Sequence, residues 1–112
     1  QLALGGHSTA VHSLERFLAI EPDEAIGHYN LGLALLGAGE VAGALVAAER
    51  TVALAAESPW SYRLRGQARR DAGKLVSALQ DYERARELAP DDISLLQEQA
   101  ALLEALRGSG DD

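Results

Sequence analysis

Three histidines are the side chains most suited to holding a metal ion in this chain of 112 residues, which contains no cysteine. His7 and His12 are five residues apart, whereas two ligands on one face of a helix need a separation of three or four. His28 falls on a different predicted helix. We therefore predict no metal site, and the lack of cysteine excludes disulfides, thiolate catalysis and cysteine zinc sites.

Serines, carboxylates and a glycine-rich stretch could serve catalysis, but no nucleophile, base and orienting group occur as a set. Ser58 is typical of a helix N-cap and Ser61 of a helix surface. Glu83 and Glu87 form an ordinary pair on a solvated helix face. The stretch 37–39, Gly-Ala-Gly, lacks the Gly-Lys-Ser/Thr continuation of a phosphate-binding loop. The sequence therefore predicts a protein that is not an enzyme and that needs no cofactor.

Arginine is the one charged residue type that clusters. The segment 59–72 holds four arginines and one aspartate, although the chain has a formal net charge of −7. Arg63 and Arg70 are two helical turns apart, so they share a face with Gln67 between them. A guanidinium presents a planar pair of donors that matches a carboxylate, so these arginines could bind acidic groups of a partner. The acidic net charge argues against nucleic acid as the partner, because phosphate binding needs clustered lysine and arginine.

Helices are the elements that position these side chains, because apolar residues recur at intervals of three and four between helix breakers and strand signals are absent. Five helices are predicted at 25–38, 41–55, 59–72, 75–89 and 93–107. A further helix from about residue 8 to residue 20 would follow a turn at Gly5 and Gly6. Gly39 and Gly73 suit C-terminal turns between antiparallel helices.

Several residue types recur every 34 residues, an interval that we call the repeat step. They are glycines at 5, 39 and 73, alanines at 10, 44 and 78, and large aliphatic residues at 20, 54 and 88. Interval and pattern together resemble the tetratricopeptide repeat, a helix-turn-helix unit of this length. The resemblance implies an all-α, right-handed α-solenoid of antiparallel helix pairs, with about six helices in roughly 2.5 to 3 repeats. The single domain would span 1–107, as a partial repeat (1–24), two repeats (25–58 and 59–92) and a capping helix (93–107), before a flexible tail (108–112). One departure from the pattern is that Arg65 stands one repeat step after Leu31.

The resemblance also implies a binding surface. In such proteins the first helices of successive repeats line a concave groove that holds an extended peptide. By register, the groove-facing residues are Ile26, Tyr29, Leu33, Leu36, Trp60, Arg63, Gln67, Arg70, Ser94, Gln97 and Ala101. The function implied is a protein–protein interaction module that binds an extended or short helical segment with acidic or carboxylate character. The partner-binding residues would be Tyr29, Asn30, Leu33, Trp60, Arg63, Gln67 and Arg70.

Two alternatives to the arginine groove stay open. The segment 59–72 could be a solvated face in which Arg65 or Arg69 pairs with acidic side chains of neighbouring helices. The chain could instead be a self-assembly or oligomerisation scaffold, in which the edge near Phe17 and Leu18 stacks on another copy or on upstream repeats.

One subfamily that resembles this chain grips the C-terminal carboxylate of chaperones with Lys, Asn and Arg at set places on the first helices. Asn30 occupies the asparagine place. Trp60 and Leu64 occupy places that should carry basic residues. We therefore do not expect this clamp, and a C-terminal peptide would have to reach Arg63 and Arg70 in a different geometry.

The last predicted helix completes the domain. We expect it to turn Ile93, Leu96, Ala100 and Leu103 inward and Gln97, Glu98 and Glu104 toward water. The composition, 47% hydrophobic and 24% charged, indicates one helical domain with a core. Because no stretch reaches the roughly 18 apolar residues of a membrane span and no signal peptide pattern occurs, we expect no membrane insertion and a cytoplasmic location. The alanine-rich, lysine-poor composition indicates a bacterial origin.

Overall fold

The chain forms six α-helices and no strand within residues 2–110. The structure is a computed structural model that describes the backbone of these residues and the side chains of residues 9–108. The helices are α1 (Leu2–Ile20), α2 (Ala25–Gly37), α3 (Val41–Leu54), α4 (Pro59–Asp71), α5 (Leu75–Leu88) and α6 (Ile93–Gly110). Sequence analysis predicted the first residue of each of the last five helices correctly. The predicted all-α fold of six helices is confirmed.

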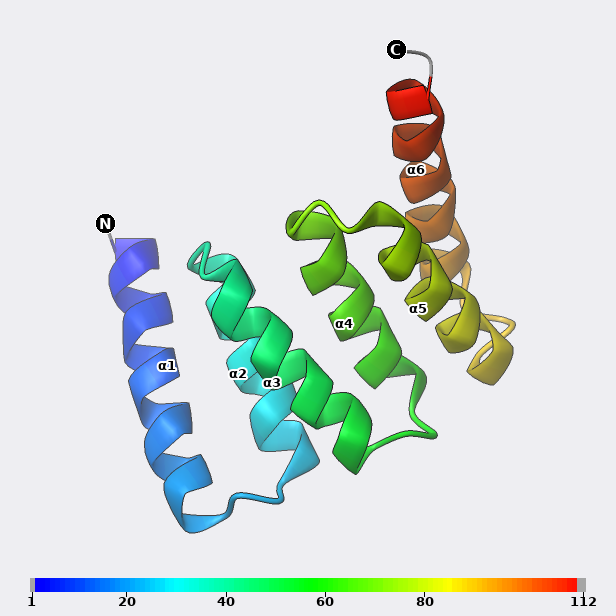
Figure 1. Cartoon of the computed structure of the whole chain (residues 1–112). Coiled ribbons are helices and arrows are strands. Elements are labelled where there is room, and N and C mark those ends of the chain that lie inside the picture. The colour runs from blue at the N-terminus through cyan, green and yellow to red at the C-terminus, as the bar shows by residue number, and fades with distance from the viewer. Residues whose placement is uncertain (1, 111–112) are drawn as a thin grey trace.

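Each helix packs against its neighbour in the sequence, and α2 also contacts α4. In Figure 1 successive helices run antiparallel, and α2 lies behind α1 and α3. The shortest dimension of the molecule is 20 Å, which corresponds to two layers of helices each about 10 Å thick. The chain is therefore a two-layer array, and side chains on α2, α4 and α6 can form one continuous surface.

Glycines make the turns that fold α3 back on α2 and α5 back on α4. Gly39 and Gly73 have φ angles of 79° and 81°, a left-handed conformation that costs other residues energy because Cβ approaches the following carbonyl oxygen. After each glycine, the next backbone N–H donates to a carbonyl oxygen near the end of the preceding helix: Glu40 to Leu35, and Lys74 to Arg69. The prediction that these glycines end helices is confirmed.

The turn geometry predicts a matched pair of substitutions. We expect Gly73→Ala to lower the free energy of unfolding by about 1–2 kcal/mol, since it forces alanine into the left-handed region. Gly108→Ala, inside α6, should be neutral or stabilising by up to about 1 kcal/mol. A new Cβ would meet nothing within 4 Å at either position, so the backbone angle alone separates the two. Urea unfolding of both variants measures this difference, and equal stabilities would contradict it.

Both outer helices are longer than the sequence suggested. The predicted turn at Gly5 and Gly6 is wrong, because α1 runs without a break from Leu2 to Ile20. Glycine weakens a helix by roughly 1 kcal/mol relative to alanine but does not forbid it, and α1 is held by packing on α2. At the other end α6 continues to Gly110, so the predicted tail at 108–110 is helical, while residues 111–112 lie outside the described part.

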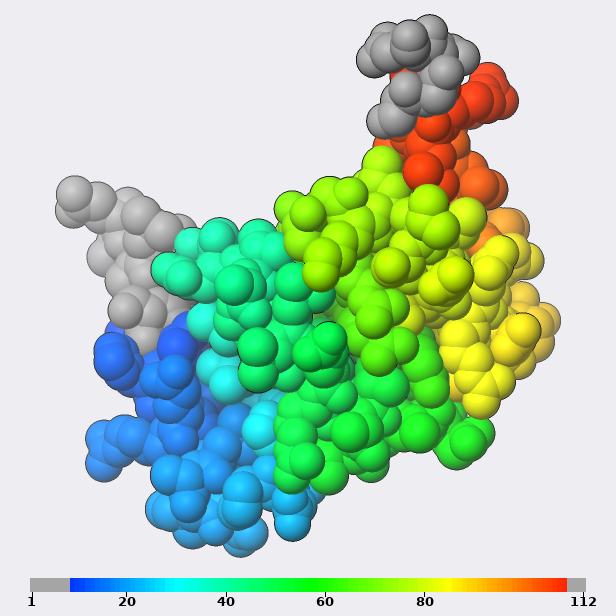
Figure 2. Space-filling model, viewed as in Figure 1, coloured from blue at the N-terminus to red at the C-terminus, as the bar shows by residue number. Residues whose placement is uncertain are grey.

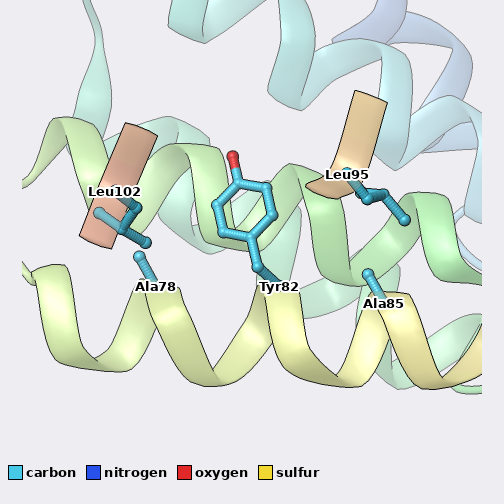
Figure 3. Close-up of a cluster of buried hydrophobic side chains, with 5 residues drawn as sticks. All are labelled: Ala78, Tyr82, Ala85, Leu95 and Leu102. Atoms are coloured by element: carbon cyan, nitrogen blue, oxygen red, sulfur yellow. The ribbon is translucent and has the colours of Figure 1, made fainter. Parts of the chain in front are cut away.

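Two clusters of buried side chains form the core. One lies between α3 and α4 and contains Ala44, Ala48, Leu64 and Ala68. The other lies between α5 and α6 and contains Ala78, Tyr82, Ala85, Leu95 and Leu102. Figure 3 shows Tyr82 rising from α5 between Leu95 and Leu102 of α6, with Ala78 and Ala85 leaving room on either side.

The predicted inward face of α6 is wrong. Leu95 and Leu102 are the buried leucines, each 1% exposed, whereas Ile93, Leu96 and Leu103 are between 48% and 68% exposed. Ala100 is also exposed, and Glu98 is half-buried instead of facing water. This orientation packs Leu95 and Leu102 on either side of Tyr82 of α5.

Candidate functional site

The residues predicted to bind a partner lie mostly on one surface, which we call the α2–α4–α6 face. It consists of exposed or half-buried side chains at matching positions of the three helices: Ile26, Tyr29, Leu33 and Leu36, then Trp60, Arg63, Gln67 and Arg70, then Ser94, Gln97 and Ala101. Tyr29 and Trp60 join α2 to α4 through an edge-to-face ring contact, with centroids 4.9 Å apart and planes at 79°. Such pairs are favourable because the positive edge of one ring meets the negative face of the other.

A small pocket opens where α4 begins. Its volume is about 190 Å³, and its lining residues are Pro59, Trp60, Arg63, Asp92 and Leu95. A cavity of roughly 150 Å³ is enough for one benzene-sized group. The pocket can therefore take one apolar side chain, with Arg63 and Asp92 as the charged residues of its lining. We call it the Trp60 pocket.

Arg63 and Gln67 both point at a carboxylate of the chain itself. Arg63 donates two hydrogen bonds to Oε2 of Glu98, one of them from Nε at 2.9 Å, and Gln67 donates to Oε1 at 3.3 Å. The hydroxyl of Tyr82 donates to the same Oε1 at 2.9 Å. Three residues from α4 and α5 thus converge on one side chain of α6. Sequence analysis missed this partner because it expected Glu98 to face water.

These contacts set the charges of the cluster. Burial opposes ionisation of Glu98, but the hydrogen bonds from Arg63, Tyr82 and Gln67 together with the charge of Arg63 outweigh it and lower the pKa of the Glu98 carboxyl. The hydrogen bond to Glu98 raises the pKa of Arg63. Burial, and then the bond to Glu98, raises the pKa of the Tyr82 hydroxyl. At neutral pH the cluster is therefore an ion pair beside a neutral phenol.

Arg70 is the more available cation of the face. Its side chain is 40% exposed, and its ion pair is with the adjacent Asp71 at 3.5 Å, a partner that is itself exposed to water. Leu33 is also well exposed, at 40%. Asn30 lines a hollow with Leu14, Phe17 and Ile26 at the α1–α2 edge.

The other two arginines of α4 have structural partners. Arg65 donates three hydrogen bonds to the carboxylate of Asp81 on α5, at 2.8–3.2 Å, and Arg69 donates one at 3.0 Å. Asp81 is 2% exposed. Two of the four arginines therefore hold α4 to α5, which confirms for Arg65 and Arg69 the pairing with a neighbouring helix that one alternative proposed. Sequence analysis did not identify Asp81, although the change from Leu31 to Arg65 pointed to a polar site there.

The preceding repeat has an apolar hollow at the positions that match the arginine–aspartate network. One repeat step takes Leu31, Leu35 and Ala47 to Arg65, Arg69 and Asp81. Leu31, Leu35 and Ala47 line an open hollow of about 500 Å³ that also includes Val46 and Arg50. In Figure 2 cyan atoms of α2 are visible between α1 in blue and α3 in green. The two junctions therefore have different chemistry at matching positions.

Metal ligands and membrane-spanning helices were both predicted to be absent. No group of three or more His, Cys, Asp or Glu side chains in the described part of the chain is arranged to hold a metal ion. The side chain of His7 lies outside the described residues, and His28 contacts the carbonyl oxygen of Pro22 at 2.8 Å. No helix in residues 2–110 combines the length and the apolar character required to cross a bilayer.

Known proteins resemble the chain in sequence and in fold. Residues 1–59 match the family model described as tetratricopeptide repeat. Protein FlbA of Caulobacter vibrioides is 32% identical over 111 residues, covering 96% of this chain. The match spans 19% of FlbA, so the chain corresponds to a small part of that relative.

Solved structures give the same result. The first TPR of Spaghetti (RPAP3) bound to the HSP90 peptide SRMEEVD is 27% identical, with a TM-score of 0.87 over 92% of this chain and 82% of that one. The first TPR domain of human RPAP3 is 26% identical, with a TM-score of 0.90 over 96% and 85%. MamA from Desulfovibrio magneticus RS-1 is 26% identical, with a TM-score of 0.82 over 88% and 56%. The chain belongs to the tetratricopeptide repeat family, a family of non-catalytic protein-interaction modules.

Proposed function

We propose that the α2–α4–α6 face binds an extended segment of a partner protein that carries one apolar side chain and one carboxylate. The observation that carries this proposal is the Trp60 pocket, an apolar slot with an arginine at its wall, on the same helix face as Arg70. Ile26 and Leu33 are further exposed apolar side chains on α2. A solved relative carries a bound acidic peptide, which supports an acidic segment as the ligand.

The spacing of the two sites suggests what the segment looks like. Trp60 and Arg70 are ten residues apart on α4, which is about 15 Å along the helix axis at 1.5 Å per residue. An extended chain covers about 15 Å in four to five residues. The proposed ligand therefore carries its apolar side chain and its carboxylate about four residues apart, as the methionine and the last aspartate of SRMEEVD are.

A peptide titration tests this proposal. Trp60 is the only tryptophan of the chain, so its fluorescence reports directly on the pocket. We expect SRMEEVD to bind. The analogue SRMQQVN with an amidated C-terminus, which lacks every carboxylate, should bind much more weakly. Arg70→Glu should weaken binding of SRMEEVD about tenfold or more, because reversal replaces attraction with repulsion.

Arg16→Glu is the matched control. Arg16 is exposed on α1, and successive repeat steps take it to Arg50 and Arg84, which lie on α3 and α5. Arg16→Glu makes the same change in net charge away from the α2–α4–α6 face, and it should leave the affinity for SRMEEVD within about twofold of the wild-type value. Equal losses for the two reversals would show that only the overall charge matters, and absence of binding to wild-type protein would overturn the proposal.

A second candidate function is assembly through the ends of the array. Leu96, Ala100 and Leu103 are exposed on α6. The positions one repeat step earlier lie on α4, on the surface that α5 covers. At the other end Phe17 is 44% exposed, although Leu18, which was expected to be part of that edge, is buried. If α6 of one copy accepts α1 of another, the mass measured by sedimentation should rise with concentration, and Leu103→Glu should abolish the rise. A constant monomer mass would exclude this function.

A further inference from the structure

Glu98 occupies donors that a bound carboxylate would need. Arg63 and Gln67 of α4 lie on the proposed binding face, and both already donate to Glu98. The Glu98 carboxylate is largely shielded from water, because its side chain is 20% exposed. Its other oxygen, Oε1, accepts a hydrogen bond from the Tyr82 hydroxyl. The internal carboxylate is thus fixed in the binding face.

We propose that Glu98 is a built-in competitor that determines where the face accepts a carboxylate, an inference that rests on the proposed function. Its charge neutralises Arg63 at the Trp60 pocket, and Asp92 adds a second negative charge at the wall of that pocket. Arg70 is paired only with exposed Asp71, among the contacts of the described residues. A carboxylate of the partner is therefore accepted at the Arg70 end of α4 and disfavoured at the Trp60 end.

The register of the repeats supports a specific role for this residue. Repeat steps backward from Glu98 reach Leu64, which is buried in the α3–α4 core, and then Asn30. An acidic residue at this position is therefore a property of the α4–α6 junction. It places a charge where the other repeats place an apolar or neutral side chain.

A double-mutant cycle on the whole chain tests the competition. The proteins are wild type, Arg63→Gln, Glu98→Gln and the combination of both, each titrated with SRMEEVD by Trp60 fluorescence. We expect Arg63→Gln alone to weaken binding, because it leaves the charge of Glu98 without its partner in the binding face. Glu98→Gln should tighten binding about tenfold by releasing Arg63. The combination should return close to the wild-type affinity.

Two controls separate competition from other effects. Glu83→Gln removes the same charge from an exposed site on α5 and should change affinity less than twofold. Thermal unfolding of each variant in the same buffer shows whether the protein remains folded, and Glu98→Gln keeps an oxygen that can accept the Tyr82 hydroxyl.

The outcomes distinguish this inference from the proposed function. If wild type binds SRMEEVD in an Arg70-dependent way but Glu98→Gln binds no more tightly, the competitor role is wrong and the function stands. A gain in the combined variant as large as in Glu98→Gln alone would also overturn the competitor role, since the gain would then not require a released Arg63. If neither wild type nor Glu98→Gln binds, both the function and the inference fail.

Discussion

Replacing Asp81 with alanine is expected to lower the free energy of unfolding by about 3 kcal/mol, because two arginines would lose a shared buried partner. Asp81 is 2% exposed and accepts hydrogen bonds from both Arg65 and Arg69. Removing one member of a buried ion pair typically costs about 3–5 kcal/mol. We expect the lower end of that range because the arginine side chains are 21% and 22% exposed, so water can reach their ends.

Equilibrium denaturation in urea measures this loss, and the chain supplies its own controls. Asp71→Ala removes an exposed carboxylate that pairs with Arg70 and should cost less than about 1 kcal/mol. The triple variant Arg65→Leu, Arg69→Leu and Asp81→Ala copies Leu31, Leu35 and Ala47 of the preceding repeat. It should recover most of the lost stability, since an apolar replacement of a buried ion pair is often neutral or stabilising. A cost for Asp81→Ala no larger than for Asp71→Ala would show that the network does not hold α4 to α5.

Tyr82→Ala should be about as damaging, with a loss of about 3–5 kcal/mol. Tyr82 is fully buried and fills the space between Leu95 and Leu102 (Figure 3). Its removal leaves a cavity that α6 cannot close without moving, and it also removes the hydroxyl that donates to Glu98. The same denaturation experiment measures the loss.

Tyr82→Phe divides this effect into its two parts. It keeps the ring and removes only the hydroxyl, so we expect a loss of about 1.5 kcal/mol, typical of a hydrogen bond to a charged group. If phenylalanine costs as much as alanine, the hydrogen bond dominates and the packing argument is wrong. If phenylalanine costs nothing, the remaining donors satisfy Glu98 without Tyr82.

Secondary structure was predictable from this sequence because its determinants are local. Glycines at 39 and 73 fix the turns by their backbone angles, and Pro59 starts α4 wherever the other helices lie. The turn at Gly5 and Gly6 was mispredicted for the same reason, since a local helix breaker was given more weight than packing on α2. Helix boundaries therefore follow from sequence except where tertiary contacts override a weak local signal.

The inward face of α6 could not be found from the period of its own apolar residues. Two apolar stripes are present, and each has the spacing of a helix face: Ile93, Leu96, Ala100 and Leu103, or Leu95 and Leu102 with Glu98 between them. Only the residues of other helices decide between them. Ser61, Leu64 and Ala68 of α4 are buried, although Ser61 was expected on a helix surface, and they lie one repeat step before Leu95, Glu98 and Leu102. The repeat register therefore gives the face of α6 once the buried face of α4 is known.

For the candidate site, the sequence could group only residues that lie on one helix. Sequence analysis selected Trp60, Arg63, Gln67 and Arg70 from one helix, because residues three or four apart on a helix must lie together. It could not assign partners, since Glu98 and Asp81 come from other helices and are far away in the sequence. Which arginines are engaged within the protein depends on those long-range contacts, so it required the structure.

The contrast between the two core clusters means that the order of the repeats is encoded in the chain. Ala48 and Leu64 meet at one junction, whereas Tyr82 and Glu98 occupy the matching positions at the next. If the helix pair α2–α3 were placed directly before α6, Glu98 would face Ala48, and Tyr29 and Leu33 would stand where Arg63 and Gln67 now donate. The carboxylate would then be buried without a cation. An array with α2–α3 directly before α6 should therefore fold poorly, so α6 requires α4–α5 as its neighbour.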